Sequence, residues 1–156
     1  MKPFNLVLAL TTASSTLIPT DIYSQNPSAN LRIIEYAEST PTQLSAYIEI
    51  SKKINMDILD GFLLLQQGWN GYNGRSFSTS VIERAKRIVL SLERQPYIFP
   101  TGRNSVQIEY RKPNRDYLEF EIYSNKIEFY IYKSGHEEER KVKSYEIAKI
   151  VEDFYA

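Results

Sequence analysis

Residues 106–132 read VQIEYRKPNRDYLEFEIYSNKIEFYIY, and apolar and polar side chains alternate along them in three successive runs. Successive side chains of a β-strand point to opposite faces of a sheet, so this alternation indicates strands that bury one face. Residues 113–115 and 124–125, between the runs, are polar and favour tight turns. The stretch therefore predicts three consecutive antiparallel strands joined by hairpin loops.

The register of these strands follows from their buried face, because apolar residues must lie opposite apolar residues across each hairpin. In the second hairpin this places Ile122 opposite Ile127. A three-residue loop in the first hairpin places Tyr110 opposite Leu118. The outer face then collects charged and aromatic side chains, which are the candidate binding residues: Glu109, Glu119, Glu121, Glu128, Tyr130, Tyr132 and Arg111.

The same register sets like charges opposite one another on the outer face. Glu109 lies beside Glu119, and Glu121 lies beside Glu128. Each such pair destabilises a sheet by some tenths of a kcal/mol, roughly. Something in the structure should therefore offset the repulsion.

Three interpretations of this face are open. In the first, water and the cations Arg111, Lys112 or Lys126 screen a solvated face. In the second, the face binds a basic partner protein, with tyrosines as anchors and glutamates as a complementary rim. In the third, the carboxylates hold Mg²⁺ or Mn²⁺ and the protein is a metal-dependent hydrolase. The strand pattern places no lysine or histidine as a base, so we assign no catalytic residue and no metal ligand.

Helices are predicted before and after the three strands in the sequence. Apolar residues recur at helical spacing over about 55–67, 79–94 and 144–155. Ser80 and Glu83 form a capping-box pattern near the start of the second helix. The fold class predicted is α+β, with a mainly antiparallel sheet of three to five strands and about three helices packed on one face.

Further short strands are predicted at residues 31–36 and at residues 46–50, which alternate more clearly, with Pro41 between the two runs. Pro100 indicates an extended connection after the second helix. Residues 136–143 are predicted to form a charged loop, because they lack apolar side chains at regular spacing.

A loop between the first two predicted helices, residues 66–75 (QQGWNGYNGR), holds three of the six glycines and the only tryptophan. Glycines before a helix N-terminus can cradle a phosphate, but here they follow a helix instead of a strand and lack the Gly-Lys-Ser/Thr ending. We therefore expect a structural loop in which aromatic side chains pack on the core and glycines permit tight reversals, with Asn73 and Arg75 exposed. The structural residues are Gly68, Trp69, Gly71, Tyr72 and Gly74.

Four short segments occur in a distinctive order, namely GWNGY at 68–72, PTG at 100–102, VQIEY at 106–110 and LEFEI at 118–122. In this order they resemble a widespread group of small uncharacterised bacterial proteins. Those proteins carry a GWDGYGA-like loop, a Pro-Thr-x-x-Gly-Gly turn, and a Leu-Glu-Trp strand followed by a Leu-Glu-Ile-Glu-Ile-like strand. The resemblance covers roughly residues 55–132.

This chain departs from the pattern of that group at several positions. Asn70 stands where the group has Asp, residues 73–74 are Asn-Gly instead of Gly-Ala, and Tyr110 replaces the Trp. Any chemistry of the group that depends on the Asp would be absent here. The resemblance implies a bacterial or phage origin and brings no activity with it.

Composition excludes several classes of function. The 19 basic and 19 acidic side chains cancel, so the chain lacks the basic excess of a protein that binds nucleic acid. The absence of cysteine excludes disulfides, thiolate catalysis and cysteine-bound zinc. His136 is the only histidine and is read as an exposed turn residue. No cofactor is indicated.

The chain divides into an N-terminal arm at residues 1–30 and a single α+β domain at 31–156. A lysine precedes the apolar run FNLVLAL at residues 4–10, which resembles a weak secretory signal. The single cation and the lack of an Ala-x-Ala site favour a cytoplasmic protein whose arm docks on the domain. The alternative is export, with residues 1–24 acting as a signal peptide. No run reaches the roughly 18 consecutive apolar residues of a membrane span.

The missing catalytic constellation and the tyrosine-glutamate face favour a small non-catalytic protein-interaction domain of bacterial or phage type. The resemblance implies an accessory or inhibitory partner in a defence, toxin-antitoxin or mobile-element system. The expected partner is another protein, with neither nucleic acid nor a membrane involved. The alternative function is the metal-dependent hydrolase using the sheet-face glutamates.

We expect the protein made by its own host to keep residue 1 at its N-terminus. Intact-mass measurement of the purified protein checks this. A mass short by the contribution of the signal-like segment would show export instead.

Overall fold

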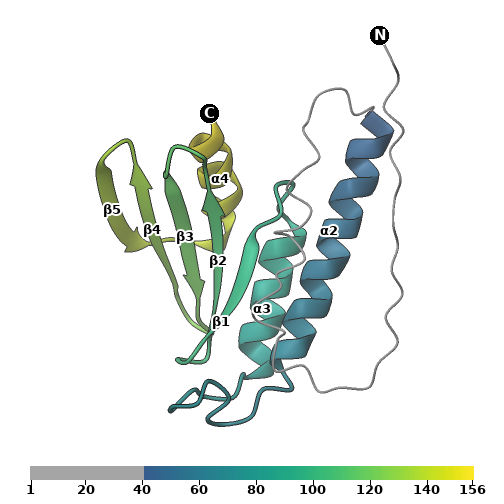
Figure 1. The fold of residues 1–156 in the computed structure, drawn as a ribbon, viewed down its shortest axis with the longest axis vertical. Helices are drawn as coiled ribbons and strands as arrows, with labels where there is room; N and C mark the ends of the chain where they lie inside the picture. Colours follow the sequence, from purple (N-terminus) through teal and green to yellow (C-terminus); the bar gives the residue numbers. More distant parts are fainter. Residues whose placement is uncertain (1–40) are drawn as a thin grey trace.

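The computed structural model describes residues 41–156 (Figure 1). The predicted strand at 31–36, the arm at 1–30 and its signal-like segment lie outside the described residues. In chain order the elements are α2 (Pro41–Phe62), α3 (Thr79–Leu90), β1 (Tyr97–Thr101), β2 (Ser105–Arg111), β3 (Tyr117–Ile122), β4 (Ile127–Lys133), β5 (His136–Lys141), the 3-10 helix η2 (Ser144–Glu146) and α4 (Ile147–Tyr155).

The five strands form one antiparallel sheet in the order β1-β2-β3-β4-β5, so each strand pairs with its neighbours in sequence. The register predicted from the apolar residues is confirmed. Ile122 lies opposite Ile127, and Tyr110 lies opposite Leu118. The outer glutamates consequently face each other as the sequence predicts.

The hairpin loops also have the predicted lengths. The Lys112 amide donates to the Asp116 carbonyl (2.9 Å) around a three-residue loop, and the Tyr123 amide donates to the Lys126 carbonyl (3.0 Å) around a two-residue loop. In the last hairpin, residues 134–135 have φ of 54° and 84°. Two consecutive positive φ angles give the twist that suits adjacent antiparallel strands.

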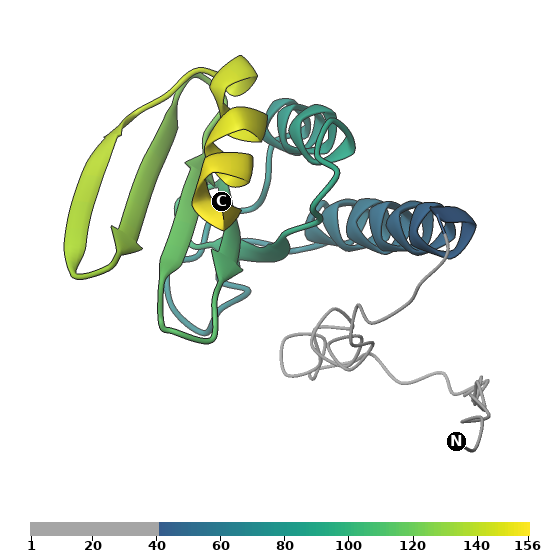
Figure 2. The ribbon, with the colours of Figure 1, turned by 90° about the horizontal axis from the view of Figure 1, so that it is seen from above.

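Helices α3 and α4 cover one face of the sheet, and α2 packs against α3 and strand β1 (Figures 1 and 2). Burying a large apolar side chain between such layers contributes about 1.5–3 kcal/mol. This arrangement confirms the α+β class. Fully buried residues come from all layers and include Leu59, Ile82, Ile108, Leu118, Phe120, Ile147 and Phe154.

The strand predicted at 46–50 is wrong, because these residues lie inside helix α2. Pro41, expected to separate two strands, is in the first turn of the helix, where its fixed φ is favourable and its missing N–H breaks no bond. Apolar residues continue at helical spacing through the run, as Leu44, Tyr47 and Ile54 do. A five-residue alternation is too short to distinguish the two periods.

Boundaries of the first two helices also differ from the prediction. Helix α2 ends at Phe62 and α3 ends at Leu90, each a few residues early. The N-cap of α3 is Ser78, whose side chain makes no capping hydrogen bond. Ser80 lies inside the helix, so the predicted capping box with Glu83 is wrong.

The sequence pattern identifies neither edge strand. Pro100, predicted in an extended connection, lies in β1, and an edge strand tolerates proline because one side of its backbone has no partner. Residues 136–143, predicted as a loop, contain β5, whose residues are all exposed. No buried face therefore marks β5 by alternation. His136 is exposed as predicted, at the start of β5.

The glycine loop after α2 is a hydrogen-bonded clasp. Gly68 and Gly71 have φ of 82° and 77°, a backbone conformation that favours glycine. The Asn70 Oδ1 accepts hydrogen bonds from the amides of Tyr72 and Gly74, both at 3.0 Å. A carboxylate oxygen would serve equally, so the Asn in place of the Asp of the resembling group fits a structural role.

The two aromatic residues of the clasp differ in burial. Trp69 packs on the core as expected, with its ring centroid 6.4 Å from that of Phe77 and its indole N–H donating to the Arg75 carbonyl (3.1 Å). The packing expected for Tyr72 is wrong, because its side chain is 84% exposed. The Asn70 side chain closes the turn from inside, so the loop needs no second aromatic anchor. Asn73 and Arg75 are exposed as predicted.

We expect Gly74→Ala to destabilise the protein by about 1–3 kcal/mol, because the added methyl group overpacks the clasp. A Cβ at Gly74 would lie 2.7 Å from Asn70 Oδ1 and 2.9 Å from Trp69 Nε1. Urea unfolding followed by Trp69 fluorescence measures the change. Gly61→Ala is the matched control, since nothing lies within 4 Å of its Cβ position in helix α2. It should stabilise the protein by about 0.5–1 kcal/mol, and equal effects at both sites would contradict the clasp.

Candidate functional site

The outer face of the sheet, opposite helices α3 and α4, gathers all the predicted binding residues. Strand alternation places them there, since every second side chain of each strand points away from the core. The paired positions Glu128 with Lys141, Tyr130 with Glu139 and Tyr132 with Glu137 extend the face onto β5. We call this surface the polar face; its central members are Gln107, Glu109, Arg111, Tyr117, Glu119, Glu121, Glu128, Tyr130, Tyr132, Glu137 and Glu139.

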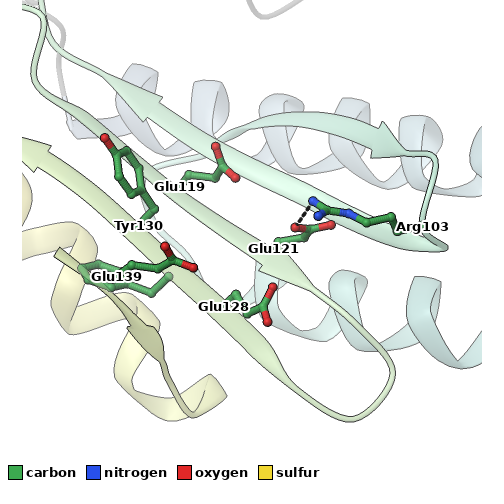
Figure 3. Close-up of a pocket in the computed structure, with 7 residues that line it drawn as sticks. Arg103, Glu119, Glu121, Glu128, Tyr130 and Glu139 are labelled. Carbon is green, nitrogen blue, oxygen red and sulfur yellow. Dashed lines mark hydrogen bonds and ion pairs between the residues drawn. The ribbon is translucent and has the colours of Figure 1, made fainter. Parts of the chain in front are cut away.

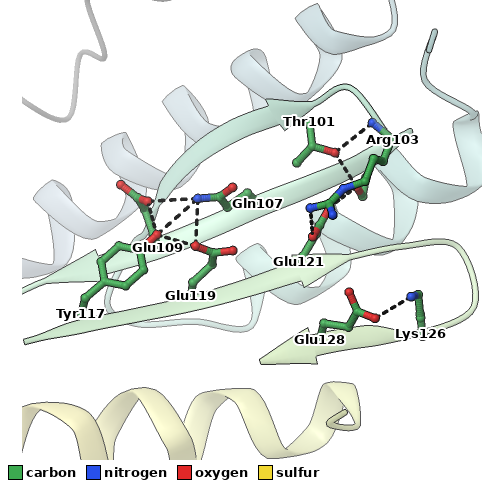
Figure 4. A network of polar contacts seen from close by, with 10 residues as sticks. Thr101, Arg103, Gln107, Glu109, Tyr117, Glu119, Glu121, Lys126 and Glu128 are labelled. Atoms are coloured by element: carbon green, nitrogen blue, oxygen red, sulfur yellow. Dashed lines mark hydrogen bonds and ion pairs between the residues drawn. The ribbon is translucent and has the colours of Figure 1, made fainter. Parts of the chain in front are cut away.

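Glu109 and Glu119, which face each other across β2 and β3, share three donated protons (Figure 4). The Tyr117 hydroxyl lies 2.7 Å from Glu109 Oε2 and 2.5 Å from Glu119 Oε2. The Gln107 amide group donates to the same two oxygens at 3.2 and 3.1 Å. Burial, together with the hydrogen bonds to Glu119 and Glu109, raises the pKa of Tyr117 well above its usual range. These donors offset the first like-charge pair.

Arg111 completes the neutralisation of Glu109. Its guanidinium lies 2.6 Å from Glu109 Oε1 and stacks over the Tyr117 ring at 5.7 Å from the centroid. The Glu109 side chain is only 3% exposed. A carboxylate this buried is stable only when paired and hydrogen-bonded, and Glu109 is both.

At the other end of the face, Glu121 is bound by two residues that the sequence pattern does not identify. Arg103 pairs with Glu121 Oε2, and the Ser105 hydroxyl donates to Glu121 Oε1 at 2.6 Å (Figure 4). Ser105 is itself buried and contacts the Thr101 hydroxyl at 2.5 Å. Both residues belong to the β1–β2 hairpin. The sequence pattern did not predict β1 as a strand, so it could not place them beside Glu121.

Glu128, opposite Glu121, has its own cation. Lys126 lies 2.5 Å from Glu128 Oε1 and lowers the pKa of that carboxyl. Burial, followed by the hydrogen bond to Glu121, raises the pKa of Tyr123 to about 12. Two of the three cations predicted to screen the face, Arg111 and Lys126, therefore do so.

The prediction for Lys112 is wrong. Its ammonium lies 4.9 Å from the centroid of the Phe154 ring of α4, on the helical side of the sheet. Lys112 occupies the turn after β2, where strand alternation no longer fixes the direction of the side chain.

A shallow pocket of about 260 Å³ opens between β3, β4 and β5 (Figure 3). Glu139 enters it from the edge strand, is exposed, and makes no ion pair with a described residue. The Tyr130 hydroxyl makes no hydrogen bond with a described residue, although its ring contacts that of Tyr117 (6.2 Å between centroids). The residues that line the pocket are Arg103, Glu119, Glu121, Glu128, Phe129, Tyr130 and Glu139.

The structure thus brings Glu119, Glu121, Glu128 and Tyr130 together around one pocket, whereas Glu109, Arg111 and Tyr132 lie on the same face outside its lining. Over residues 41–156, no three carboxylate or imidazole side chains converge in an arrangement that could hold a metal ion. The pocket can still attract a positively charged side chain, because four carboxylates and one guanidinium line it.

Comparison with protein-family models, with curated proteins and with solved structures gave no match to this chain. The resemblance of the glycine loop and the two strands to a bacterial group therefore stays a prediction. Within the described part of the chain, no helix has both the length and the apolar character that crossing a bilayer requires.

We expect Tyr117→Phe to lower the free energy of unfolding by about 1.5–3 kcal/mol at pH 7, since two carboxylates lose a shared donor. A folded-state pKa above the unfolded value of about 10 gives stability that is present below pH 10 and is lost as pH rises further. The difference between wild type and variant should therefore shrink above pH 10. Urea denaturation of wild type and variant at pH 7 and above pH 10 measures this difference.

Tyr132→Phe is the matched control for this experiment, because the Tyr132 hydroxyl makes no hydrogen bond with a residue of the described range. It should change the free energy of unfolding by less than about 0.5 kcal/mol at pH 7. Equal losses in the two variants would show that Tyr117 does not bridge the carboxylates.

Proposed function

We propose that the protein is a small non-catalytic protein-interaction domain whose polar face binds a basic segment of a partner protein. The observation that carries the proposal is the unequal charge of the pocket. Its lining holds four glutamates on hydrogen-bonded strands and one arginine, Arg103, from the turn between β1 and β2. Arg103 pairs with Glu121 and Lys126 pairs with Glu128, so Glu119 and Glu139 are the lining carboxylates without an ion pair to a described residue, and a cationic side chain from a partner could bind between them.

Two lining residues support this use of the pocket. Glu139 is exposed and has no cation of its own among the described residues. Tyr130, opposite Glu139 across β4 and β5, offers an aromatic ring beside the carboxylate. A Lys or Arg side chain over such a ring gains about 0.5–1 kcal/mol at an exposed site. The pair can therefore recognise a cation by charge and by shape.

The neutralised part of the face supports the same function in another way. Glu109 and Glu121 are buried and paired with Arg111 and Arg103. Their charges are already neutralised, so they do not need a cation from the partner protein. A binding surface built on paired strands loses little conformational entropy when it binds. Charges at its exposed rim mainly raise the association rate and make binding sensitive to salt.

We place this activity in the cytoplasm of a bacterial or phage-infected cell. The resemblance to the bacterial group supports an accessory or inhibitory role in a defence, toxin-antitoxin or mobile-element system. In such a role the polar face would cover a basic, functional segment of the partner. The identity of that partner follows from the experiment below.

We expect a photo-reactive amino acid placed at Tyr130 to cross-link a protein partner in the host lysate, which mass spectrometry then identifies. The same group placed at Asp57, on the exposed side of α2, should give no cross-link to that protein. A partner that cross-links only from position 57, or from neither position, would overturn the proposal.

Charge reversal tests the interaction quantitatively with the purified partner. Glu139→Lys should weaken binding at least tenfold, equivalent to about 1.4 kcal/mol, because it adds a cation where the partner's cation binds. Asp57→Lys changes the net charge equally on α2 and should leave the affinity unchanged. Titration calorimetry at two salt concentrations measures both variants, and similar affinities would contradict the assignment of the polar face.

A further inference from the structure

Strand β5 is an edge of the sheet, since it pairs with β4 and with no other described strand. The Val142 amide donates to the Ile127 carbonyl (3.0 Å), which shows that residue 142 turns its backbone toward β4. Backbone groups in an antiparallel strand alternate in direction. The N–H and C=O groups of Glu137, Glu139 and Lys141 therefore point away from β4, toward the free edge.

This edge lacks most of the features that usually block strand addition. Proteins protect edges with prolines, bulges, a covering helix or loop, or charged side chains, and charge is the one of these protections that β5 carries. Strand β5 contains no proline or glycine, pairs with β4 in a continuous register, and is exposed at every residue. The opposite edge strand, β1, carries Pro100 and contacts α2.

The charge of β5 selects what can pair with it. Residues 137–139 are three consecutive glutamates, and Arg140 and Lys141 follow them in the same strand. A twofold antiparallel pair of two β5 strands centred on Glu138 would set Glu138 against its own copy and Glu137 against Glu139, which is unfavourable, whereas centring on Glu139 would set Glu138 against Arg140 and Glu137 against Lys141. Charge therefore closes only the first of these registers to a second copy. The pocket beside the edge is lined by four glutamates and one arginine, which is the charge that favours a strand carrying lysine or arginine.

The edge and the pocket lie close enough to be used together. Glu139 has its outward backbone groups on the edge and its side chain in the pocket beside Tyr130. A strand added to β5 would lie about 4.8 Å away. A lysine or arginine opposite Glu139 would project onto the polar face, and its long side chain would reach the pocket (Figure 3).

We propose that the partner's basic segment binds in extended form as a sixth strand on β5. This inference rests on the proposed function and specifies the conformation of its ligand. Backbone hydrogen bonds to Glu137, Glu139 and Lys141 supply sequence-independent affinity. Alternate basic side chains facing Glu137 and Glu139 supply specificity, as in other complexes formed by strand addition.

The probe for this inference is an alternating lysine and threonine peptide of about ten residues, the upper length of common strands. Added to the full chain, it should slow hydrogen exchange of the Glu137, Glu139 and Lys141 amides, measured residue by residue by NMR. An alternating glutamate and threonine peptide should slow none of them. Failure of the basic peptide to slow exchange at these three amides would overturn the inference.

A proline substitution separates backbone pairing from charge. Lys141→Pro removes an outward amide while keeping the bonds to β4, because residue 141 does not donate to β4. It should weaken binding of the basic peptide at least tenfold. Lys141→Ala removes the same positive charge but keeps the amide, so it should bind the peptide as tightly as wild type or more tightly. Equal affinities of the two variants would contradict strand addition.

The two proposals fail in different ways. Cross-linking from Tyr130 together with unprotected β5 amides would reject the sixth strand and leave the polar face as the binding surface. Loss of the Tyr130 cross-link would reject the function itself. Amide exchange in the unaltered protein does not depend on whether the proline variant folds.

Discussion

The polar face is determined by the apolar face behind it. Because side chains alternate along a strand, the register that buries Leu118 and Phe120 also sets Glu109 beside Glu119 on the other side. A like-charge pair costs at most about 1 kcal/mol, whereas each buried apolar side chain contributes about 1.5–3 kcal/mol. A one-residue slip would expose the whole apolar set. The register therefore holds, and neighbouring side chains must relieve the repulsion.

That relief is unequal across the face. Donors or cations surround Glu109 and Glu121 closely enough for both carboxylates to be buried. Toward β5, Glu128 pairs with Lys126 and lies opposite Lys141, whereas Glu139 makes no ion pair with a described residue. The glutamates that are buried and neutralised, Glu109 and Glu121, are therefore different from Glu139, which is exposed and makes no ion pair with a described residue. In the proposed function, a partner would bind Glu139 without displacing the donors and cations of Glu109 and Glu121.

The predictability of the fold follows burial. Strands β2 to β4 have an apolar buried face and a polar outer face that is mostly half-buried, so the alternation of apolar and polar side chains predicts both the strands and their pairing. Strand β5 buries neither face, and β1 carries a proline, so no periodic signal marks them. Residues 46–50 alternate by chance within the helical spacing of α2. Short patterns on exposed segments fit both periods, and tertiary packing decides between them.

The predictability of the site follows from the same cause. The glutamates and tyrosines of the face lie on the central strands, where alternation identifies them, but Arg103 and Ser105 depend on the β1–β2 hairpin. That hairpin is held by the glycine clasp, since the Arg75 amide donates to the Gly102 carbonyl (3.1 Å). A Cβ on Gly102 would approach the Asn70 amide nitrogen to 3.1 Å.

The clasp is therefore connected to the polar face through the β1–β2 hairpin. On its other side, the hairpin is tied to the start of α3, because the Ser78 amide donates to Asn104 Oδ1 at 2.9 Å. Arg103 lies between these two attachments, which leaves its guanidinium directed at Glu121. The glycine clasp at residues 66–75 thus supports the site without lining the pocket, because it is hydrogen-bonded to the residue next to Arg103. It positions the cation that keeps Glu121 buried and leaves the charge of the pocket concentrated toward Glu139.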